Sequence, residues 1–356
     1  MIPSIGRSKV GLALFVSLCA VLGLLHGASS AAVSHTSSQP RGQAVQPEHV
    51  VLFVLEGVDQ ASVKTGPMPL LGKLVKEGSA TWEARAVTPA LRLPTMASLF
   101  TGMPVEKHGI NWNTFDFVRG YPRPPTMFDY LDLSGGRDSA IFFMDESLYQ
   151  LAKPEPYTDY QMCGPLKAEC STGMLLTYIR EYFRKATSGH GYGHAILSLP
   201  HLLVVHLPEA GRAGKVSGWR SKEYQASLRS VDKAMGEVLD LYKRLGILDR
   251  TAVIVTSLNN EDTGIPGGNG KAVTAQMPTS PWIAWGVGIK AGYAIKQPVS
   301  LIDTGATVMR TLGLTTHTEW ESRPVEEIFR GPFVAAPGTP GSMDAGSSAG
   351  ASGGQP

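Results

Sequence analysis

The stretch from Val87 to Ile110, "VTPALRLPTMASLFTGMPVEKHGI", has the organisation of an approach to an active site. A Pro-bounded loop leads into a short helix, and a Thr-Gly pair ends this helix before a His-Gly-Ile turn. Thr95 is the best placed hydroxyl to act as a nucleophile, although a Thr at a helix start is more often a cap and needs a base or metal to react. At the centre stands Arg92, whose guanidinium cannot attack an electrophile but can hold an anion.

Histidines elsewhere in the chain are weaker candidates for chemistry. His190 and His194 in "HGYGH" have a spacing that could share a metal ion, but no carboxylate or cysteine completes a motif, so we expect a loop. His201 and His206 bound the apolar run "HLLVVH". His206 falls near the expected mouth of a site, where we predict a hydrogen-bonded structural side chain.

Cys163 and Cys170 are the two cysteines that follow the N-terminal segment. In an exported chain their proximity favours a local disulfide, and two buried thiols are the alternative. No further soft ligand accompanies them, so we do not expect a cysteine-based metal site.

The chain ends differ in composition from its centre. Arg7 and Lys9 precede an apolar run of 16 residues and a small-residue stretch, so residues 1–32 are predicted to be a secretory signal peptide; an uncleaved anchor is the alternative. Residues 33–48 are expected to form a flexible leader, residues 49–333 the folded domain, and residues 334–356 a disordered Gly/Ser/Ala-rich tail. We therefore expect export through the secretory pathway, with no membrane span after cleavage.

The charge of the chain is balanced. Removing residues 1–32 takes away one Arg and one Lys but no acid, which leaves 30 basic and 30 acidic residues. This balance does not indicate a nucleic-acid partner.

Short, unbroken apolar runs alternate with segments of helical period. Continuous runs favour strands that are covered on both faces of a largely parallel sheet, and we predict five: His49 to Gly57, Asp138 to Glu146, His201 to Glu209, Thr251 to Asn259 and Ser280 to Gly288. The clearest helix is predicted from Glu223 to Gly246, with a single apolar stripe. This alternation predicts a three-layer α/β/α sandwich with its chemistry beyond the carboxyl ends of the strands.

Taken in order, these segments resemble the type I phosphodiesterase/nucleotide pyrophosphatase branch of the alkaline phosphatase superfamily. The resemblance rests on "VVLFVLEGV", "TPALRLPTMASLFTGMPVEKHGINWN", the region from "HLPEAGRAGKVSG" to "TAVIVTSLNN", and "SPWIAWGVGIKAG". It implies an alkaline phosphatase-like fold over roughly residues 49–330. Active members use two zinc ions and a Thr or Ser nucleophile, so each corresponding position can be compared with this sequence.

The first two family positions are only partly retained. The resemblance aligns a metal-binding Asp-Gly with Glu56-Gly57, so a carboxylate remains. It aligns the nucleophile, just before a Leu-Pro pair, with Arg92. A guanidinium can neither attack phosphorus nor bridge metal ions.

The remaining ligand positions are lost. Alignment of the Asp-x-x-Gly-His element with "GRAGKVSG" places Gly211 and Lys215 where the family has Asp and His. Leu258 and Asn259 replace a later Asp-His pair, and Asn269 corresponds to a final His. Zinc does not bind an ammonium or an aliphatic side chain, so no metal and no cofactor is predicted here.

The resemblance and the substitutions together leave three classes of function. We expect a pseudoenzyme that keeps the fold for binding or assembly, with Arg92 and Lys215 as candidates to hold an anionic small molecule at the helix N-terminus. A purely structural subunit of a protein complex, with the old site closed by salt bridges, is the second class. The alternative is a metal-dependent phosphodiester or pyrophosphate hydrolase with a rearranged site, for which Thr95 is the fallback nucleophile.

Overall fold

The computed structural model describes residues 46–153, 158–162, 171–188, 198–258 and 279–335, all within one structural unit, Gln43–Pro356. Several predictions concern residues outside these ranges. They are the signal peptide, most of the leader, the tail beyond residue 335, and the residues Cys163, Cys170, His190, His194, Asn259 and Asn269.

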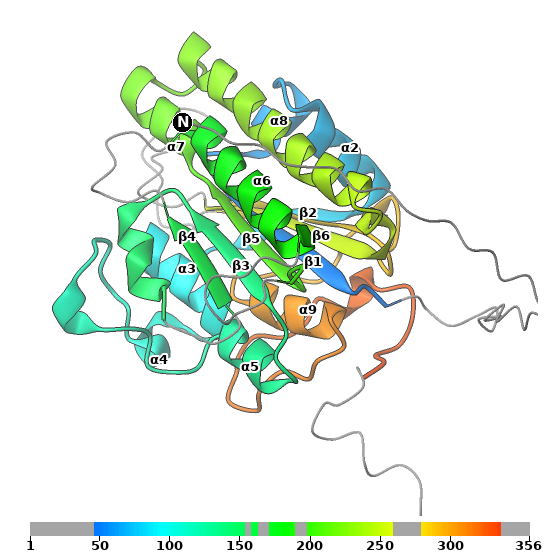
Figure 1. Ribbon diagram of the computed structural model, residues 1–356. Helices are drawn as coiled ribbons and strands as arrows, with labels where there is room; N and C mark the ends of the chain where they lie inside the picture. The colour runs from blue at the N-terminus through cyan, green and yellow to red at the C-terminus, as the bar shows by residue number, and fades with distance from the viewer. Residues whose placement is uncertain (1–45, 154–157, 163–170, 189–197, 259–278, 336–356) are drawn as a thin grey trace, which may run out of the picture. The chain divides into compact units, whose positions relative to one another are not determined.

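A central sheet organises the described part of the chain (Figure 1). Its strand order is β4-β3-β5-β1-β6-β7-β2-β8. Strands β3, β4, β5, β1 and β6 pair in parallel, while β7 is antiparallel to both β6 and β2. The largely parallel sheet is thus confirmed. The strands are β1 (His49–Glu56), β2 (Ser79–Arg85), β3 (Ser139–Phe143), β4 (Thr158–Met162), β5 (Leu202–Leu207), β6 (Thr251–Leu258), β7 (Thr279–Gly286) and β8 (Tyr293–Ala294).

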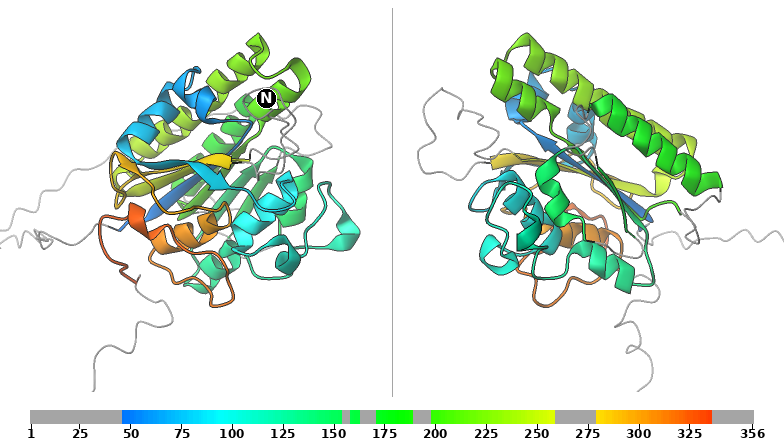
Figure 2. Two further views of the ribbon diagram at one scale, coloured as in Figure 1. Left: turned by 180° about the vertical axis from the view of Figure 1, so that it is seen from behind. Right: turned by 60° about the vertical axis from the view of Figure 1, so that its left-hand side comes forward.

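Helices cover both faces of the sheet, as the two views of Figure 2 show. One face carries α1 (Gln60–Lys64), α2 (Pro69–Glu77), α6 (Thr172–Ser188), α7 (Glu209–Ser217) and α8 (Lys222–Arg244). The other carries α3 (Arg92–Thr101), α4 (Val105–His108), α5 (Met127–Leu133) and α9 (Asp303–Thr311). Short 3-10 turns are η1 (Phe117–Arg119), η2 (Glu146–Leu151), η3 (Leu248–Arg250) and η4 (Glu326–Ile328). The predicted three-layer α/β/α architecture is confirmed.

The continuous apolar runs form strands because both faces of the sheet are covered. In β1, Val50, Leu52 and Val54 belong to the core beneath one helical layer. Val51, Phe53 and Leu55 belong to the core beneath the other. All eight residues of β1 are buried, which accounts for the absence of polar alternation in its sequence.

Helix α8 follows its predicted stripe closely. The stripe residues Leu228, Val231, Met235, Val238, Leu239 and Tyr242 are all buried against the sheet. Gly246, with φ +68°, follows the end of the helix, where a left-handed backbone conformation favours glycine. Within the described residues, no helix is both long and apolar enough to cross a bilayer.

Candidate functional site

The candidate site lies where the central parallel strands end. Glu56 is the last residue of β1, and His206 is the next-to-last residue of the adjacent strand β5. On the opposite side, Leu258 of β6 is in register with Glu56. The carboxyl edge of the sheet therefore presents one carboxylate, one imidazole and one leucine side by side.

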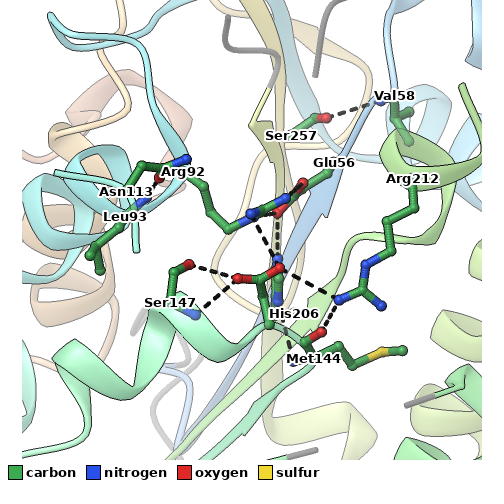
Figure 3. Close-up of polar contacts among 11 residues, drawn as sticks. Glu56, Val58, Arg92, Leu93, Asn113, Met144, Ser147, His206, Arg212 and Ser257 are labelled. Atoms are coloured by element: carbon green, nitrogen blue, oxygen red, sulfur yellow. Dashed lines mark hydrogen bonds and ion pairs between the residues drawn. The ribbon is translucent and has the colours of Figure 1, made fainter. Parts of the chain in front are cut away.

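Arg92 is the first residue of α3 and binds Glu56 with two hydrogen bonds (Figure 3). Its Nε donates to Oε1 at 2.5 Å and its Nη2 donates to Oε2 at 2.8 Å. This bidentate geometry matches the fork of a guanidinium to the two oxygens of a carboxylate. The Glu56 side chain is 1% exposed and that of Arg92 13% exposed, so the pair is shielded from solvent.

The side chain of Asn113 caps the N-terminus of α3. The Leu93 N–H donates to Asn113 Oδ1 at 2.8 Å, and the helix has no cap from its own N-cap residue, Leu91. A free helix N-terminus attracts anions through its unpaired N–H groups. Here Asn113 satisfies one of those donors.

His206 is the second partner of Glu56. Its Nδ1 accepts a hydrogen bond from the Met144 N–H at 3.3 Å, which leaves Nε2 to donate to Glu56 Oε1 at 2.8 Å. Burial opposes the charged form of Glu56, but the hydrogen bonds from Arg92 and His206 outweigh it and lower its pKa to about 2. Glu56 therefore remains a carboxylate at neutral pH.

Asp145 and Arg212 extend this network toward the surface. Asp145 follows Met144 in the sequence. Its Oδ2 lies 3.2 Å from Arg92 Nη1 and 3.6 Å from Arg212 Nη2. The backbone N–H and the hydroxyl of Ser147 both donate to Asp145 Oδ1, at 3.0 and 2.6 Å. Arg212, on α7, also donates to the Met144 carbonyl. Two guanidinium groups and two carboxylates thus balance one another around the His206 imidazole (Figure 3).

Two glycines allow α7 to approach the end of β1. Gly57 has φ +71°, and a Cβ placed there would lie 2.6 Å from the backbone of Gly211. A Cβ placed on Gly211 would lie 3.0 Å from the Glu56 Cβ. Gly211 therefore occupies a tight backbone contact, a packing role that its alignment with a family Asp did not reveal.

The other predicted positions have different surroundings. Lys215 is exposed on α7, and no ion pair joins it to another described residue; Arg212, one helical turn earlier, is the cation that reaches the network. Leu258 is fully buried in the core. Thr95 is also fully buried, and its hydroxyl has no hydrogen-bond partner among the described residues. Asn259 and Asn269 lie outside the described ranges.

The described side chains do not fit the two zinc ions of active relatives. Among the described residues that the resemblance aligns with ligand positions, only Glu56 offers a metal-binding atom, and Arg92 occupies both of its oxygens. Within the described ranges there is no group of three or more His, Cys, Asp or Glu side chains with the arrangement of a metal site. A guanidinium held between two carboxylates also repels a cation at that place.

Sequence reasoning missed two members of this network, Asp145 and Arg212, and the side chain that caps α3, Asn113. Asp145 is the next-to-last residue of the predicted strand segment Asp138 to Glu146, and the rule that pointed to Glu56 could have pointed to it as well. Arg212 stands within the "GRAGKVSG" element but matches no ligand position. No motif in the sequence pointed to Asn113. Its neighbour Trp112 is partly buried and packs against the core, with the Arg119 guanidinium 4.7 Å from its ring centroid.

Comparisons of the sequence and fold with known proteins give a consistent result. A family model described as type I phosphodiesterase/nucleotide pyrophosphatase matches residues 50–258. No curated protein sequence matches the chain.

Solved structures share the fold at low identity. Murine ectonucleotide pyrophosphatase/phosphodiesterase 5, solved as an inactive variant in complex with AMP, is 14% identical with a TM-score of 0.57. That alignment covers 80% of this chain and all of the murine chain. A 2-O glycosaminoglycan sulfatase, BT1596, is also 14% identical with a TM-score of 0.57, over 79% of this chain and 73% of its own. Since the family model spans more than half of the chain, the protein belongs to the type I phosphodiesterase/nucleotide pyrophosphatase family, within an alkaline phosphatase-like fold.

Proposed function

We propose that this chain is a noncatalytic member of its family, which keeps the fold for binding or assembly while salt bridges close the former catalytic centre. The observation that carries the proposal is the bidentate pairing of Arg92 with Glu56. Arg92 stands at the position of the nucleophile, and Glu56 stands at the position of a metal ligand. Each therefore satisfies the other, and neither is left for a substrate or a metal ion.

The burial of the Thr95 hydroxyl supports a noncatalytic protein over a rearranged hydrolase. A nucleophilic Thr needs a base or a metal within hydrogen-bond distance. Thr95 is fully buried and its hydroxyl contacts no such group among the described residues. In this structure the Thr95 side chain is out of reach of a substrate.

The charge balance favours a closed centre over an anion site. A phosphate between Arg92 and Arg212 would have to displace Asp145, which already contacts both guanidinium groups. Lys215 is exposed on α7 and offers no second fixed cation beside Arg92. We therefore place assembly with other proteins ahead of small-molecule binding.

We also propose that the chain enters the secretory pathway. The support is the apolar run that follows Arg7 and Lys9, together with the small residues after it. The N-terminal sequence of protein recovered from expressing cells tests this, since cleavage near residue 32 is expected. An intact N-terminus on membrane-bound protein would indicate an uncleaved anchor.

Hydrolysis assays test the loss of catalysis. The purified protein is incubated with a phosphodiester and a phosphomonoester substrate, with and without added zinc or manganese, beside the same protein carrying Thr95→Ala. We expect both proteins to give the rate of the blank. Turnover by the natural sequence that Thr95→Ala abolishes would overturn the proposal and support a rearranged hydrolase.

Ligand-induced thermal shifts distinguish a closed centre from a binding site. Inorganic phosphate and AMP, the latter because the murine neighbour was solved with it, serve as probes. A ligand that binds the folded state raises Tm in proportion to the logarithm of its concentration. We expect no rise with either probe. A rise that Arg212→Gln reduces would indicate an anion site instead.

A further inference from the structure

Two histidines lie side by side at the amino edge of the sheet, at the opposite end from the former catalytic centre. His49 begins β1 and His201 directly precedes β5, and the strand register places them opposite each other on adjacent strands. Their ring centroids are 6.1 Å apart. Tyr242 of α8 covers His49 edge-on, with centroids 6.3 Å apart, and leaves it 6% exposed. The pair is therefore a buried titratable cluster with no role in the network around the former centre.

These histidines hold the segment 198–201, which leads into β5, against the two neighbouring strands. The His49 Nδ1–H donates to the Pro200 carbonyl at 2.9 Å, which joins the segment to the start of β1. The His201 N–H donates to the Asp138 carbonyl at 2.8 Å, just before β3. Because Nδ1 of His49 carries the hydrogen in its bond to a carbonyl, Nε2 is the atom that takes up a proton in acid.

Each carboxylate near the two histidines already has a partner among the described residues. The Glu48 carboxylate is paired with Arg250 at 2.5 Å. The Asp138 carboxylate accepts from the Ser198 hydroxyl, and the neighbouring Arg137 guanidinium opposes a further positive charge. Two carboxylates thus face two guanidinium groups, so protons on both imidazoles would add two positive charges beyond this balance.

The helices over the pair contribute neutral groups. From α8, Tyr242 is fully buried, and burial raises the pKa of its phenol, so it stays uncharged. From α6, the Tyr182 hydroxyl donates to the Ser198 carbonyl at 3.3 Å. Burial lowers the pKa of both histidines, and a charge on His49 further lowers the pKa of His201. Both imidazoles are therefore held in the neutral form near pH 7.

We propose that His49 and His201 form an acid-sensitive latch, in which protonation of both releases the segment 198–201 from β1 and β3 while the centre of the sheet stays folded. A charged imidazole is stable only where it reaches water or a free carboxylate. Strand ends open at a lower free energy than the centre of a sheet, so the edge yields first. Histidine is the side chain that changes charge in this pH range and serves pH-sensitive proteins in this way. The latch does not depend on the proposed loss of catalysis.

Hydrogen exchange in the full chain tests the latch. Exchange is followed by mass spectrometry at pH 7.5 and pH 5.5, and each rate is divided by the intrinsic rate at that pH. The N–H groups of Val50, His201 and Leu202 bond across the strand starts. In peptides that contain them we expect protection to fall about tenfold in acid. Peptides from the centre of β6, residues 252–257, should keep their protection.

Asparagine variants separate the two histidines from a general effect of acid. His49→Asn keeps an N–H that can donate to the Pro200 carbonyl but takes up no proton, and His201→Asn removes the other titrating group. We expect each single variant to reduce the loss of protection to about threefold, and the double variant to abolish it. His317→Asn removes an exposed histidine stacked on Tyr130, in the other helical layer, and should leave the loss unchanged.

An NMR titration of the imidazole protons adds a test on the natural chain. We expect the His49 and His201 signals to titrate at lower pH than that of His317, and the loss of protection to follow them with about two protons per opening. In His201→Asn, His49 should titrate at higher pH because one opposing charge is gone. An acid response in the double variant equal to that of the natural chain, or an equal loss of protection in the centre of β6, would overturn the latch. Independent titration of the two histidines would also overturn it.

Discussion

Each end of strand β1 carries a buried ionisable side chain, and burial has a different outcome for the two. Glu56 keeps its charge, whereas His49 is shifted toward its neutral form. At the carboxyl end, Glu56 is 1% exposed and remains charged, since Arg92 and His206 bind its oxygens. At the amino end, His49 is 6% exposed, and burial lowers its pKa. Its nearest rings are those of His201, 6.1 Å away, and Tyr242, 6.3 Å away, neither of which compensates a positive charge.

The difference shows that burial alone does not decide the charge of a side chain. Taking a charge out of water is costly at both ends of the strand. At the carboxyl end, the Arg92 guanidinium contacts the buried carboxylate directly. At the amino end, Glu48 is paired with Arg250, and the hydrogen bond of His49 goes to the neutral Pro200 carbonyl. The carboxyl end is therefore a buried ion network, while at the amino end no ion pair contacts the buried imidazole directly among the described residues.

Removing the Arg92 guanidinium should have the largest effect on the difference between the two ends of β1. In Arg92→Met, Glu56 keeps only His206 as a partner, and we expect the free energy of unfolding to fall by about 3–5 kcal/mol. Urea denaturation followed by circular dichroism measures it. Combining Arg92→Met with Glu56→Gln removes the stranded charge and should restore part of the loss; a double variant less stable than the single one would contradict the network.

Acid should remove the contribution of Glu56. Its pKa is about 2 in the folded protein and 4.5 for an unperturbed glutamate, so the unfolded state binds more protons between these limits. Its contribution, on the order of 3 kcal/mol, is present above about pH 4.5 and is lost as the pH falls toward 2. The matched protein is Glu56→Gln, whose stability should depend less steeply on pH across this range.

The histidine end should respond at higher pH. Because burial lowers the pKa of His49 below 6.5, its unfolded form takes up a proton first, and stability falls as the pH drops below that value. The slope from this one imidazole is at most about 1.4 kcal/mol per pH unit. We expect His49→Asn to flatten the pH profile of Tm between pH 7 and pH 5, while Glu56→Gln should not; equal profiles for the natural protein and His49→Asn would contradict this assignment.

The smallest effect is expected at Lys215. This side chain is exposed and has no ion pair with a described residue, so Lys215→Ala should change the free energy of unfolding by less than about 0.5 kcal/mol. Arg212→Ala, on the same helix, removes the contact with Asp145 and should cost more. A larger loss of unfolding free energy in Lys215→Ala than in Arg212→Ala would contradict the assignment of Arg212 to the network.

Much of the fold could be predicted from the sequence because the strongest patterns are local. Buried parallel strands such as β1 and β6 read as continuous apolar runs, and α8 shows one stripe ending before Gly246. The antiparallel direction of β7 could not be predicted in this way. A strand buried on both faces has the same continuous apolar sequence whether it pairs in parallel or antiparallel. Strand β2 was not predicted; its intermediate burial hides the pattern.

The site was predictable at Glu56, Arg92 and His206, but not at Asp145 and Arg212. Glu56 and Arg92 stand in segments whose order along the chain matches the family. Asp145 and Arg212 join them through the packing of η2 and α7, which brings together residues 67 positions apart in the sequence. The rotation of α7 also decides that Arg212, and not Lys215, faces the network, and an alignment of ligand positions contains no information about that rotation.

Metal content tests the central claim most directly. The purified protein and Glu56→Gln are incubated with zinc, dialysed against buffer without metal, and analysed by inductively coupled plasma mass spectrometry. If Arg92 has replaced metal at Glu56, both proteins should retain the same zinc, well below one ion per chain. One or two zinc ions per natural chain, lost with Glu56→Gln, would contradict the account.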